Sequence, residues 1–282
     1  MVIRQSVWIG LALLASTLGF GVGVVADSSA ELERWTTGSH RDPGNADRNR
    51  YRHPAETLAF FALEPSMTVV EVWPSRGWYT EILAPFLRRD GKYYAAGFAL
   101  TAKRTPEWRK KMQRELEKKL AARPDLYDRV VVTELSIPER TEMAPSGTAD
   151  MVLTFRNVHN WMKGNYAPQM FEAMFEALKP GGVLGVVEHR AKPGTTVERM
   201  IESGYVTETE VKRLAKGAGF RFVGSSEVNA NPLDTADHPL GVWTLPPTLR
   251  LGDNDRAKYV AIGESDRMTL KFVKPKKRRD RK

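Results

Sequence analysis

The sequence contains no cysteine, and this absence excludes several kinds of chemistry. No disulfide can form, and the chain has neither a thiol nucleophile nor a cysteine-ligated metal site. Histidine is scarce as well, with five in the whole chain. The set His159, His189 and His238 lacks the spacing of a metal motif, so no metal site is predicted.

The formal net charge of the chain is +9, but the residues before position 274 carry nearly equal numbers of basic and acidic side chains. Residues 274–282 hold seven basic side chains and one acid, and this short stretch accounts for most of the surplus. A specific nucleic-acid partner is therefore not expected. We interpret residues 275–282 as a solvated basic tail, with weak contact to an anionic surface as the alternative.

Acidic residues are missing from the first 26 positions, which carry Arg4 and then an uncharged, mostly apolar run. This layout predicts a signal peptide over residues 1–26 and a periplasmic or secreted protein. An apolar run of about 20 residues can also span a bilayer, so a protein anchored by an uncleaved helix is the alternative. The polar segment 27–53 is then expected to form an N-terminal arm.

Short apolar runs alternate with helical patterns through the rest of the chain. Seven runs are predicted as strands: residues 68–72, 92–98, 129–135, 149–155, 182–188, 220–228 and 267–274. Between two of them, Trp108, Met112, Leu116 and Leu120 recur at helical spacing, which we interpret as core packing. The pattern predicts one doubly wound α/β domain over residues 54–274, with an antiparallel final pair of strands.

A sharp turn follows the first of these strands. Residues 74–77, Pro-Ser-Arg-Gly, cannot extend the strand, and helical spacing begins at Trp78. A strand, a tight turn and a helix N-terminus together form the corner at which many α/β domains bind a nucleotide.

Three segments carry further motifs: Glu-Val-Trp-Pro-Ser-Arg-Gly-Trp-Tyr-Thr at 71–80, Ala-Asp-Met-Val-Leu-Thr-Phe-Arg-Asn-Val-His-Asn-Trp at 149–161, and Leu-Lys-Pro-Gly-Gly-Val-Leu at 178–184. They resemble successive motifs of class I S-adenosylmethionine-dependent methyltransferases. The first is also similar to that of exported predicted methyltransferases with a Trp-Pro-x-x-Gly-Trp-Tyr turn. The resemblance implies a Rossmann-like seven-stranded sheet with an antiparallel last strand, and a cofactor over the carboxyl ends of the first two strands.

The resemblance also assigns S-adenosylmethionine binding to the first turn and to the segment after the fourth strand. The residues concerned are Glu71, Trp73, Pro74, Ser75, Gly77, Tyr79 and Asn157. Two departures from the family pattern stand out: Trp73 and Ser75 replace glycines, and no acid for the ribose follows the strand 92–98. The aromatic faces of Trp73, Trp78 and Tyr79 can instead attract a sulfonium cation.

Catalytic candidates follow the fourth and fifth strands, whose carboxyl ends lie beside that of the first strand in this topology. His159 is predicted as a general base or substrate orienter, with His189 second, because imidazole accepts protons near neutral pH. Arg156 and Asn160 are substrate candidates in the same crevice. Purely structural hydrogen bonding by both histidines is the alternative.

The segment 229–264 is much longer than a hairpin connection needs. Loops of this length in compact domains are usually lids or binding loops, or they form an ordered clasp. Asp234, His238 and Trp243 are the substrate candidates in this segment, and a folded clasp is the alternative.

Two functions fit these patterns. One is an exported S-adenosylmethionine-dependent methyltransferase that acts on a small molecule or an envelope component. The other is a noncatalytic periplasmic protein that keeps the fold and binds another small ligand. The depleted motifs and export away from the cytoplasmic cofactor supply favour the second. The order of the motifs and the polar residues at 156–160 favour the first, which is the function we expect.

Overall fold

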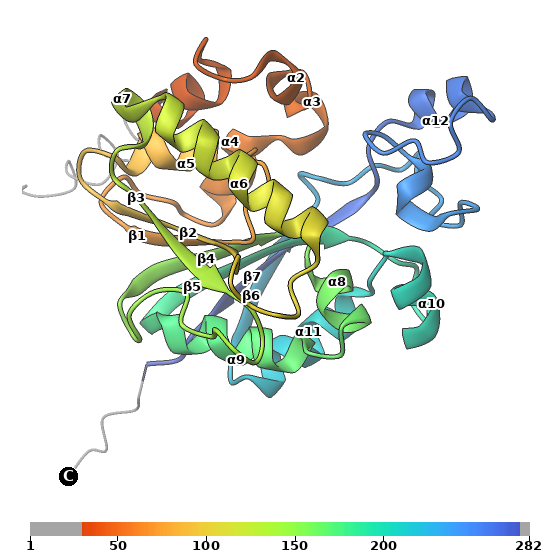
Figure 1. The fold of residues 1–282 in the computed structure, drawn as a ribbon. Coiled ribbons are helices and arrows are strands. Elements are labelled where there is room, and N and C mark those ends of the chain that lie inside the picture. The colour runs from red at the N-terminus through yellow and green to blue at the C-terminus, as the bar shows by residue number, and fades with distance from the viewer. Residues whose placement is uncertain (1–29, 277–282) are drawn as a thin grey trace, which may run out of the picture.

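The computed structural model describes residues 30–276, which form a seven-stranded sheet with helices on both faces (Figure 1). The strands are β1 (Thr68–Val72), β2 (Lys92–Phe98), β3 (Val130–Leu135), β4 (Ala149–Phe155), β5 (Leu178–His189), β6 (Arg221–Ser226) and β7 (Arg267–Val273). The predicted signal peptide over residues 1–26 and most of the basic tail lie outside the described residues. Among the residues described, no helix is long and apolar enough to cross a membrane.

The strand order is β3-β2-β1-β4-β5-β7-β6, and this confirms the predicted doubly wound fold. The first five strands run parallel to one another, whereas β7 runs antiparallel to β5 and to β6. The antiparallel last strand is therefore confirmed, but it lies inside the sheet, and β6 forms the edge. Because β7 is reversed, its first residue, Arg267, pairs with His189 at the end of β5.

Strand β5 is longer than predicted. The strand was predicted to begin at residue 182, but β5 begins at Leu178, which pairs with Ala149 of β4. The N–H of Gly181 also donates to the carbonyl of Lys274, at 2.8 Å. These bonds keep the Pro-Gly-Gly segment in the sheet, although the register with β4 shifts there.

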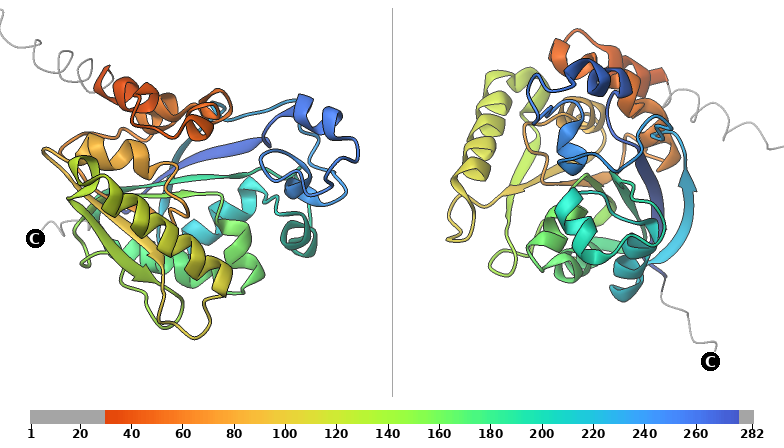
Figure 2. Two further views of the ribbon diagram at one scale, coloured as in Figure 1. Left: turned by 45° about the horizontal axis from the view of Figure 1, so that its top comes forward. Right: turned by 90° about the vertical axis from the view of Figure 1, so that its right-hand side faces the viewer.

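Helices cover the two faces of the sheet in separate groups (Figure 2). The first group is α4 (Pro54–Phe60), α5 (Thr80–Leu87), α6 (Glu107–Ala122) and α7 (Pro124–Tyr127). The second is α8 (Val158–Lys163), α9 (Ala167–Ala177), α10 (Val197–Ser203) and α11 (Glu208–Gly217). In the N-terminal arm, residues 30–37 are helical and two short helices follow, α2 (Pro43–Ala46) and α3 (Asn49–Arg52). With both faces covered, the central strands can be almost entirely apolar.

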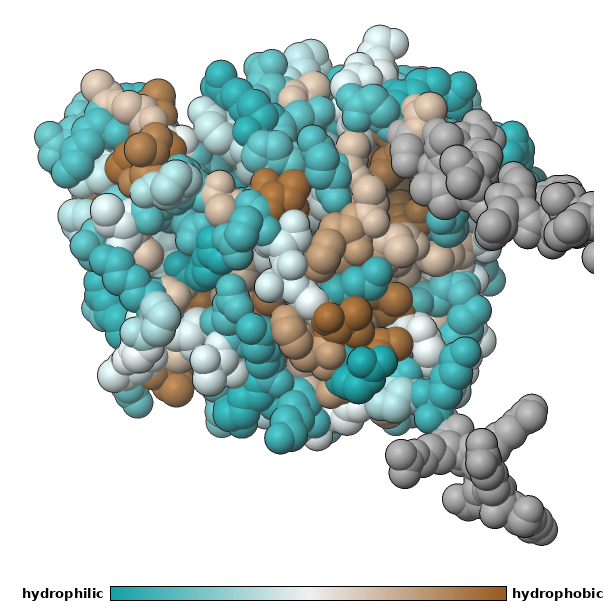
Figure 3. Space-filling model, turned by 180° about the vertical axis from the view of Figure 1, so that it is seen from behind, coloured by the Kyte–Doolittle hydropathy of each residue, from teal (hydrophilic) through white to brown (hydrophobic). Residues whose placement is uncertain are grey.

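The predicted core packing of the apolar stripe on α6 is confirmed for only part of the helix. Leu116 and Leu120 are buried as predicted, but Trp108 is 55% exposed, so the prediction was wrong there. The reason is position, since α6 begins just beyond the loop that follows β2 and its first turn lies past the end of the sheet. Elsewhere the surface is mixed, and on the face shown in Figure 3 hydrophobic residues form smaller groups among hydrophilic ones.

The long segment between β6 and β7 is folded. It contains a 3-10 helix, η1 (Gly241–Thr244), and a short helix, α12 (Arg256–Ile262). In Figure 1 the segment forms the blue lobe at the right. Part of it, around η1, faces the carboxyl ends of the parallel strands and closes one side of a crevice.

Candidate active site

A crevice of about 240 Å³ lies over the carboxyl ends of β1, β2, β4 and β5. Its walls come from the turn after β1, the start of α6, Glu264 and Ser265 shortly before β7, and η1 with the segment that follows it. The end of β2 and the end of β5 are three strand spacings apart in the sheet, or roughly 14 Å. The crevice is therefore elongated along the edge of the sheet.

The turn after β1 keeps the backbone shape of a glycine-rich turn without most of the glycines. Trp73, Ser75 and Gly77 have φ angles of 49°, 57° and 81°. These are left-handed values that glycine adopts without strain, and a non-glycine residue held there often marks a functional site. The indole of Trp73 is buried, and its Nε1 donates to the carbonyl of Leu135 at 3.2 Å. Its ring lies 5.0 Å from that of Phe98, so Trp73 fills space beyond β2 and β3.

Glu71 lies at the end of β1 and lines the crevice. Thr80 Oγ1 donates to its carboxylate at 3.1 Å, and Tyr93 donates a second, short hydrogen bond. Burial raises the pKa of Glu71 to about 7, against the opposing effect of these two hydrogen bonds. Glu71, the acid of the predicted cofactor motif, is thus hydrogen-bonded to neighbouring side chains of the domain.

Aromatic rings form much of the crevice wall. They are Trp73, Trp78, Tyr79, Phe98, Trp108, Phe155 and Trp243. Tyr79 stacks on Phe155 with a centroid distance of 3.6 Å and an angle of 11° between the rings. Sequence reasoning proposed Trp73, Trp78, Tyr79 and Trp243 but missed the others. Phe98 and Phe155 are the last residues of β2 and β4. Position at the carboxyl end of a strand, which singled out the residues after β4 and β5, could therefore have identified these two as well.

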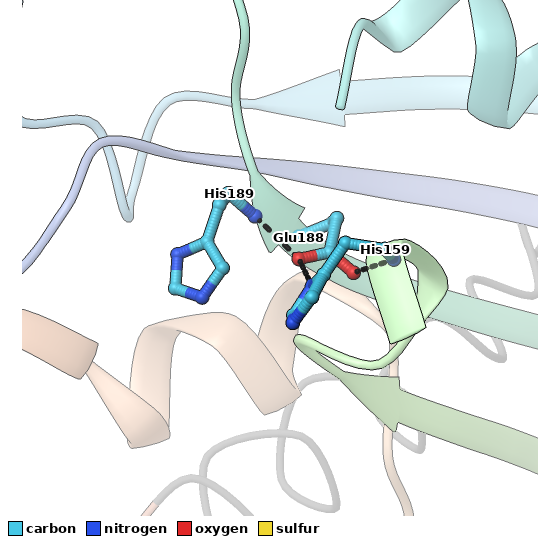
Figure 4. A group of neighbouring side chains, drawn as sticks. All are labelled: His159, Glu188 and His189. Carbon is cyan, nitrogen blue, oxygen red and sulfur yellow. Dashed lines mark hydrogen bonds and ion pairs between the residues drawn. The ribbon is translucent and has the colours of Figure 1, made fainter. Parts of the chain in front are cut away.

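Two histidines and a glutamate meet where β4 and β5 end (Figure 4). Glu188 is fully buried, and its carboxylate accepts the N–H of Val158 at 2.6 Å and that of His189 at 2.8 Å. His159 Nδ1 lies 3.0 Å from the same carboxylate, which favours the tautomer with a proton on Nδ1. Its Nε2 then accepts from Asn160 Nδ2 at 2.9 Å. Both nitrogens of His159 are therefore engaged by protein groups.

His189 is differently placed, because its side chain lines the crevice. Its Nδ1 lies 2.5 Å from Ser265 Oγ, and within residues 30–276 its Nε2 has no hydrogen-bond partner. Burial, followed by the charges of His159 and Arg156, holds the pKa of His189 well below its usual range. His189 therefore offers a neutral nitrogen to the crevice, and the geometry favours it over His159 as the proton acceptor.

The ligand atoms of His159, Glu188 and His189 all lie within 4.8 Å of one another, a spacing compatible with a metal ion. Two observations favour a hydrogen-bonded group instead. The carboxylate of Glu188 already accepts several N–H donors. The charges of Arg156, Arg267 and Arg52 act on His189 from nearby, and they would repel a cation.

A buried ion cluster borders the same crevice and was missed by sequence reasoning. Glu264 accepts from Arg48 Nε at 2.6 Å, from Arg52 Nε at 2.9 Å and from Arg267 Nη1 at 3.1 Å. Burial opposes ionisation of Glu264, but the surrounding guanidiniums hold its pKa at about 2. The sequence did hold a signal for this cluster. An antiparallel last strand places the residues that precede it at the end of the sheet where β5 ends, so Glu264 could have been included among the site candidates.

The remaining predicted residues fall into two groups. Pro74, Ser75, Arg156, Asn157 and Trp243 line the crevice. Asn157 also ties two strands together, because its Nδ2 donates to the carbonyl of Val72 at 2.9 Å. Asn160 lies outside this lining, in a neighbouring depression that it shares with Trp108 and Trp243.

Asp234 and His238 also lie outside the lining. Asp234 accepts from Tyr205 Oη at 2.9 Å and from the N–H of Asp266 at 2.7 Å, and it lies 2.8 Å from His238 Nε2. These contacts hold this part of the segment 229–264 against the domain, while Trp243 of the same segment lines the crevice.

Comparison with known proteins establishes the fold. No protein-family model and no curated protein matches the chain. Among solved structures, a SAM dependent methyltransferase from Aquifex aeolicus is 20% identical with a TM-score of 0.50, over 71% of this chain and 93% of that chain. The [4+2]-cyclase SpnF is 15% identical with a TM-score of 0.54, over 90% of this chain and 95% of that chain. A putative sarcosine dimethylglycine methyltransferase from Galdieria sulphuraria is 12% identical with a TM-score of 0.54, over 89% and 98%. One of the three is thus a cyclase by name, so this fold does not by itself specify a reaction.

Proposed function

We propose that the protein is an S-adenosylmethionine-dependent methyltransferase with a small-molecule or envelope-component substrate. The observation that carries this proposal is one continuous crevice, which joins the left-handed turn after β1 to the free Nε2 of His189. The turn supplies a cofactor corner in the position expected for the fold, and His189 supplies a proton acceptor two strands away.

The residues of the crevice fit S-adenosylmethionine, with one difference from the family pattern. Phe98, Trp108 and Met112 line the β2 end, where an acid for the ribose was expected. They offer stacking surface for an adenosine group instead. The backbone of residues 73–77 can hold the amino-acid end of the cofactor, and the ring of Tyr79 can face the sulfonium. The ring of Trp78 already has two cations against it, since the guanidiniums of Arg41 and Arg52 each lie 4.7 Å from its centroid.

When bound, the cofactor supplies an electrophilic methyl group on a sulfonium. Ser265 Oγ lies 2.5 Å from Nδ1 of His189, and as the acceptor of the Nδ1 proton it would fix the tautomer that leaves Nε2 as the acceptor. His189 Nε2 would take the proton from the substrate nucleophile as that nucleophile is methylated and the cofactor leaves as its demethylated thioether, provided that a negative charge in the crevice offsets the guanidiniums that keep His189 neutral. The wall formed by Trp243 and the adjoining prolines, Pro246 and Pro247, narrows the access of water to this position.

The location and the partners belong to the same proposal. We infer that residues 1–26 direct export, that the mature protein acts in the periplasm or outside the cell, and that it belongs with exported methyltransferases carrying the Trp-Pro-x-x-Gly-Trp-Tyr turn. The tail adds weak contact with an anionic surface. Fractionation of producing cells tests export, and a full-length product confined to the cytoplasm would refute it.

Calorimetric titration of the purified protein with S-adenosylmethionine, and with its demethylated product S-adenosylhomocysteine, tests the enzyme directly. We expect saturable binding of both and a rise in melting temperature. Neither heat nor a thermal shift at millimolar cofactor would reject the enzyme. That outcome would leave the noncatalytic ligand-binding protein as the function.

A further inference from the structure

The crevice wall next to β4, β7 and the N-terminal arm has more cationic side chains than acidic ones. Four guanidiniums gather there, those of Arg48, Arg52, Arg156 and Arg267. Two acids of the described chain line the crevice, Glu264 and Glu71. With Glu71 and the buried Glu188 both counted as ionised beside Glu264, the four guanidiniums still exceed the carboxylates by one positive charge.

Donors in this cluster lack acceptors. Arg52 is 2% exposed, and its Nη1 and Nη2 are buried without a hydrogen-bond partner in the described chain. Its guanidinium lies 4.7 Å from the centroid of the Trp78 ring, and only its Nε reaches Glu264. Burial, followed by the charge of Arg156, holds the pKa of Arg52 well below its usual range. An uncompensated buried cation is costly, so an anion brought close to it would be bound favourably.

Arg156 brings this charge to the crevice surface. It follows β4 directly and has a left-handed φ of 60°, while its N–H donates to the carbonyl of Val187 at 2.7 Å. The half-buried side chain lines the crevice, and its guanidinium makes no hydrogen bond within residues 30–276. Burial lowers the pKa of Arg156 to about 10, which leaves it cationic at neutral pH.

Tyr79 adds a neutral donor beside it. The ring is fixed by its stack on Phe155, the residue before Arg156. Tyr79 lines the crevice, and its hydroxyl makes no hydrogen bond within residues 30–276. Burial raises the pKa of Tyr79 to about 12, so the hydroxyl keeps its proton. A guanidinium fork and a hydroxyl are a donor set suited to the oxygens of a carboxylate or phosphate.

We propose that Arg156 and Tyr79 bind one carboxylate or phosphate group of the ligand that occupies the crevice, with Arg52, Arg48 and Arg267 stabilising its charge from behind. Assigning this group to the methyl-accepting substrate rests on the proposed function. The anion site itself does not, because it is defined by protein groups alone.

The test is calorimetric titration of the purified full chain with inorganic phosphate and, separately, with acetate, at an ionic strength held constant with sodium chloride. We expect saturable binding of at least one anion, and the tighter of the two identifies the group as phosphate or carboxylate. Arg156→Gln should weaken binding about tenfold or more, since it removes a charged bidentate donor. Tyr79→Phe keeps the ring stack and should weaken binding by a few-fold.

Arg213→Gln is the matched control, because Arg213 pairs with Glu210 on α11 and does not line the crevice. It should bind the anion as the unaltered protein does. Absence of saturable binding by both anions, or equal binding by Arg156→Gln, would overturn the site. Arg156→Lys keeps the charge without the fork and should bind with intermediate affinity.

Repeating the titration with saturating S-adenosylhomocysteine separates this proposal from the proposed function. Simultaneous binding assigns the anion to the substrate. Displacement of the anion would identify the site as one for the cofactor's own carboxylate and overturn the substrate assignment. Anion binding by a protein that does not bind S-adenosylhomocysteine would reject the methyltransferase and leave the anion site standing.

Discussion

The two halves of the crevice, one over β1 and β2 and the other over β4, β5 and β7, are lined by different kinds of side chain. Over β1 and β2 the lining is aromatic and apolar, and the one acid there, Glu71, is engaged by Tyr93 and Thr80. Over β4, β5 and β7 the lining is polar and cationic, with donors that lack partners in the described chain. The first half therefore relies on shape and stacking, whereas the second is organised to compensate a negative charge.

The largest effect is expected at Glu264, which holds the cationic half together. Glu264→Gln leaves three hydrogen-bonded guanidiniums without their carboxylate, and removing one partner of a buried pair typically costs about 3–5 kcal/mol. Urea unfolding measures the loss. The control is Glu227→Gln, which removes an exposed carboxylate from Arg190 and should change stability by less than about 1 kcal/mol. Equal losses in the two variants would contradict the central role of Glu264.

The second effect is a pH dependence that originates in Glu71. Its pKa is about 7 in the folded protein, above the ordinary value of about 4.3, so the folded state binds the extra proton. This contribution is fully present below the unfolded pKa and is lost as the pH rises through about 7, with a magnitude on the order of 3 kcal/mol. Urea unfolding at about pH 5 and about pH 8 should show the fall.

Glu71→Gln should flatten this part of the stability profile. A variant with the same decline between the two pH values would show that another group is responsible.

The third prediction concerns turnover. His189→Gln should lower methyl transfer by roughly 100-fold, as expected for loss of a general base, while the binding of S-adenosylhomocysteine is kept. His159→Ala should act indirectly, through the Glu188 contact, and should lower the rate less than His189→Gln. Single-turnover rates of the two variants decide between them. A larger loss in His159→Ala would restore the order that the sequence suggested.

The strands were predictable because buried parallel strands are continuous apolar runs bounded by Gly, Pro and charged residues. Three of the predicted ranges, those now β1, β2 and β4, match the structure at both ends. The start of β5 was not predictable in this way, since Lys-Pro-Gly-Gly is ordinarily a turn and only its pairing with β4 and Lys274 keeps it extended.

The site was predictable only where it follows a parallel strand. His159, Glu188 and His189 share one edge because their strands are neighbours. The contact between Arg52 and Glu264 joins residues 212 positions apart, and no local pattern reports such a pair. The position of Trp108 was misread for a related reason, since a helical stripe does not reveal where the helix extends past the sheet.

The fourth prediction tests the aromatic half. Trp108→Ala removes an exposed ring at the β2 end and should weaken S-adenosylhomocysteine binding by a few-fold to about tenfold, with little loss of stability. Phe222→Ala, at the edge strand β6, is the control and should leave this affinity unchanged. Unaltered affinity in Trp108→Ala would place the adenosine group elsewhere.

The smallest effect is expected for the folding stability of Arg156→Gln. This guanidinium has no hydrogen-bonded partner in the described chain, so its loss should cost less than about 1 kcal/mol or slightly stabilise the protein. Arg52→Gln, which breaks the contact with Glu264, should be clearly less stable. A large loss in Arg156→Gln would mean that the residue is structural.

One titration tests the division of the crevice most directly. S-adenosylhomocysteine is added to the protein with and without saturating phosphate or acetate, whichever anion binds more tightly. If the two halves bind different groups, S-adenosylhomocysteine and the anion should occupy the crevice at the same time. The anion should then leave the affinity for S-adenosylhomocysteine unchanged or increase it. Mutual exclusion of the two, or no binding of S-adenosylhomocysteine under either condition, would contradict the account.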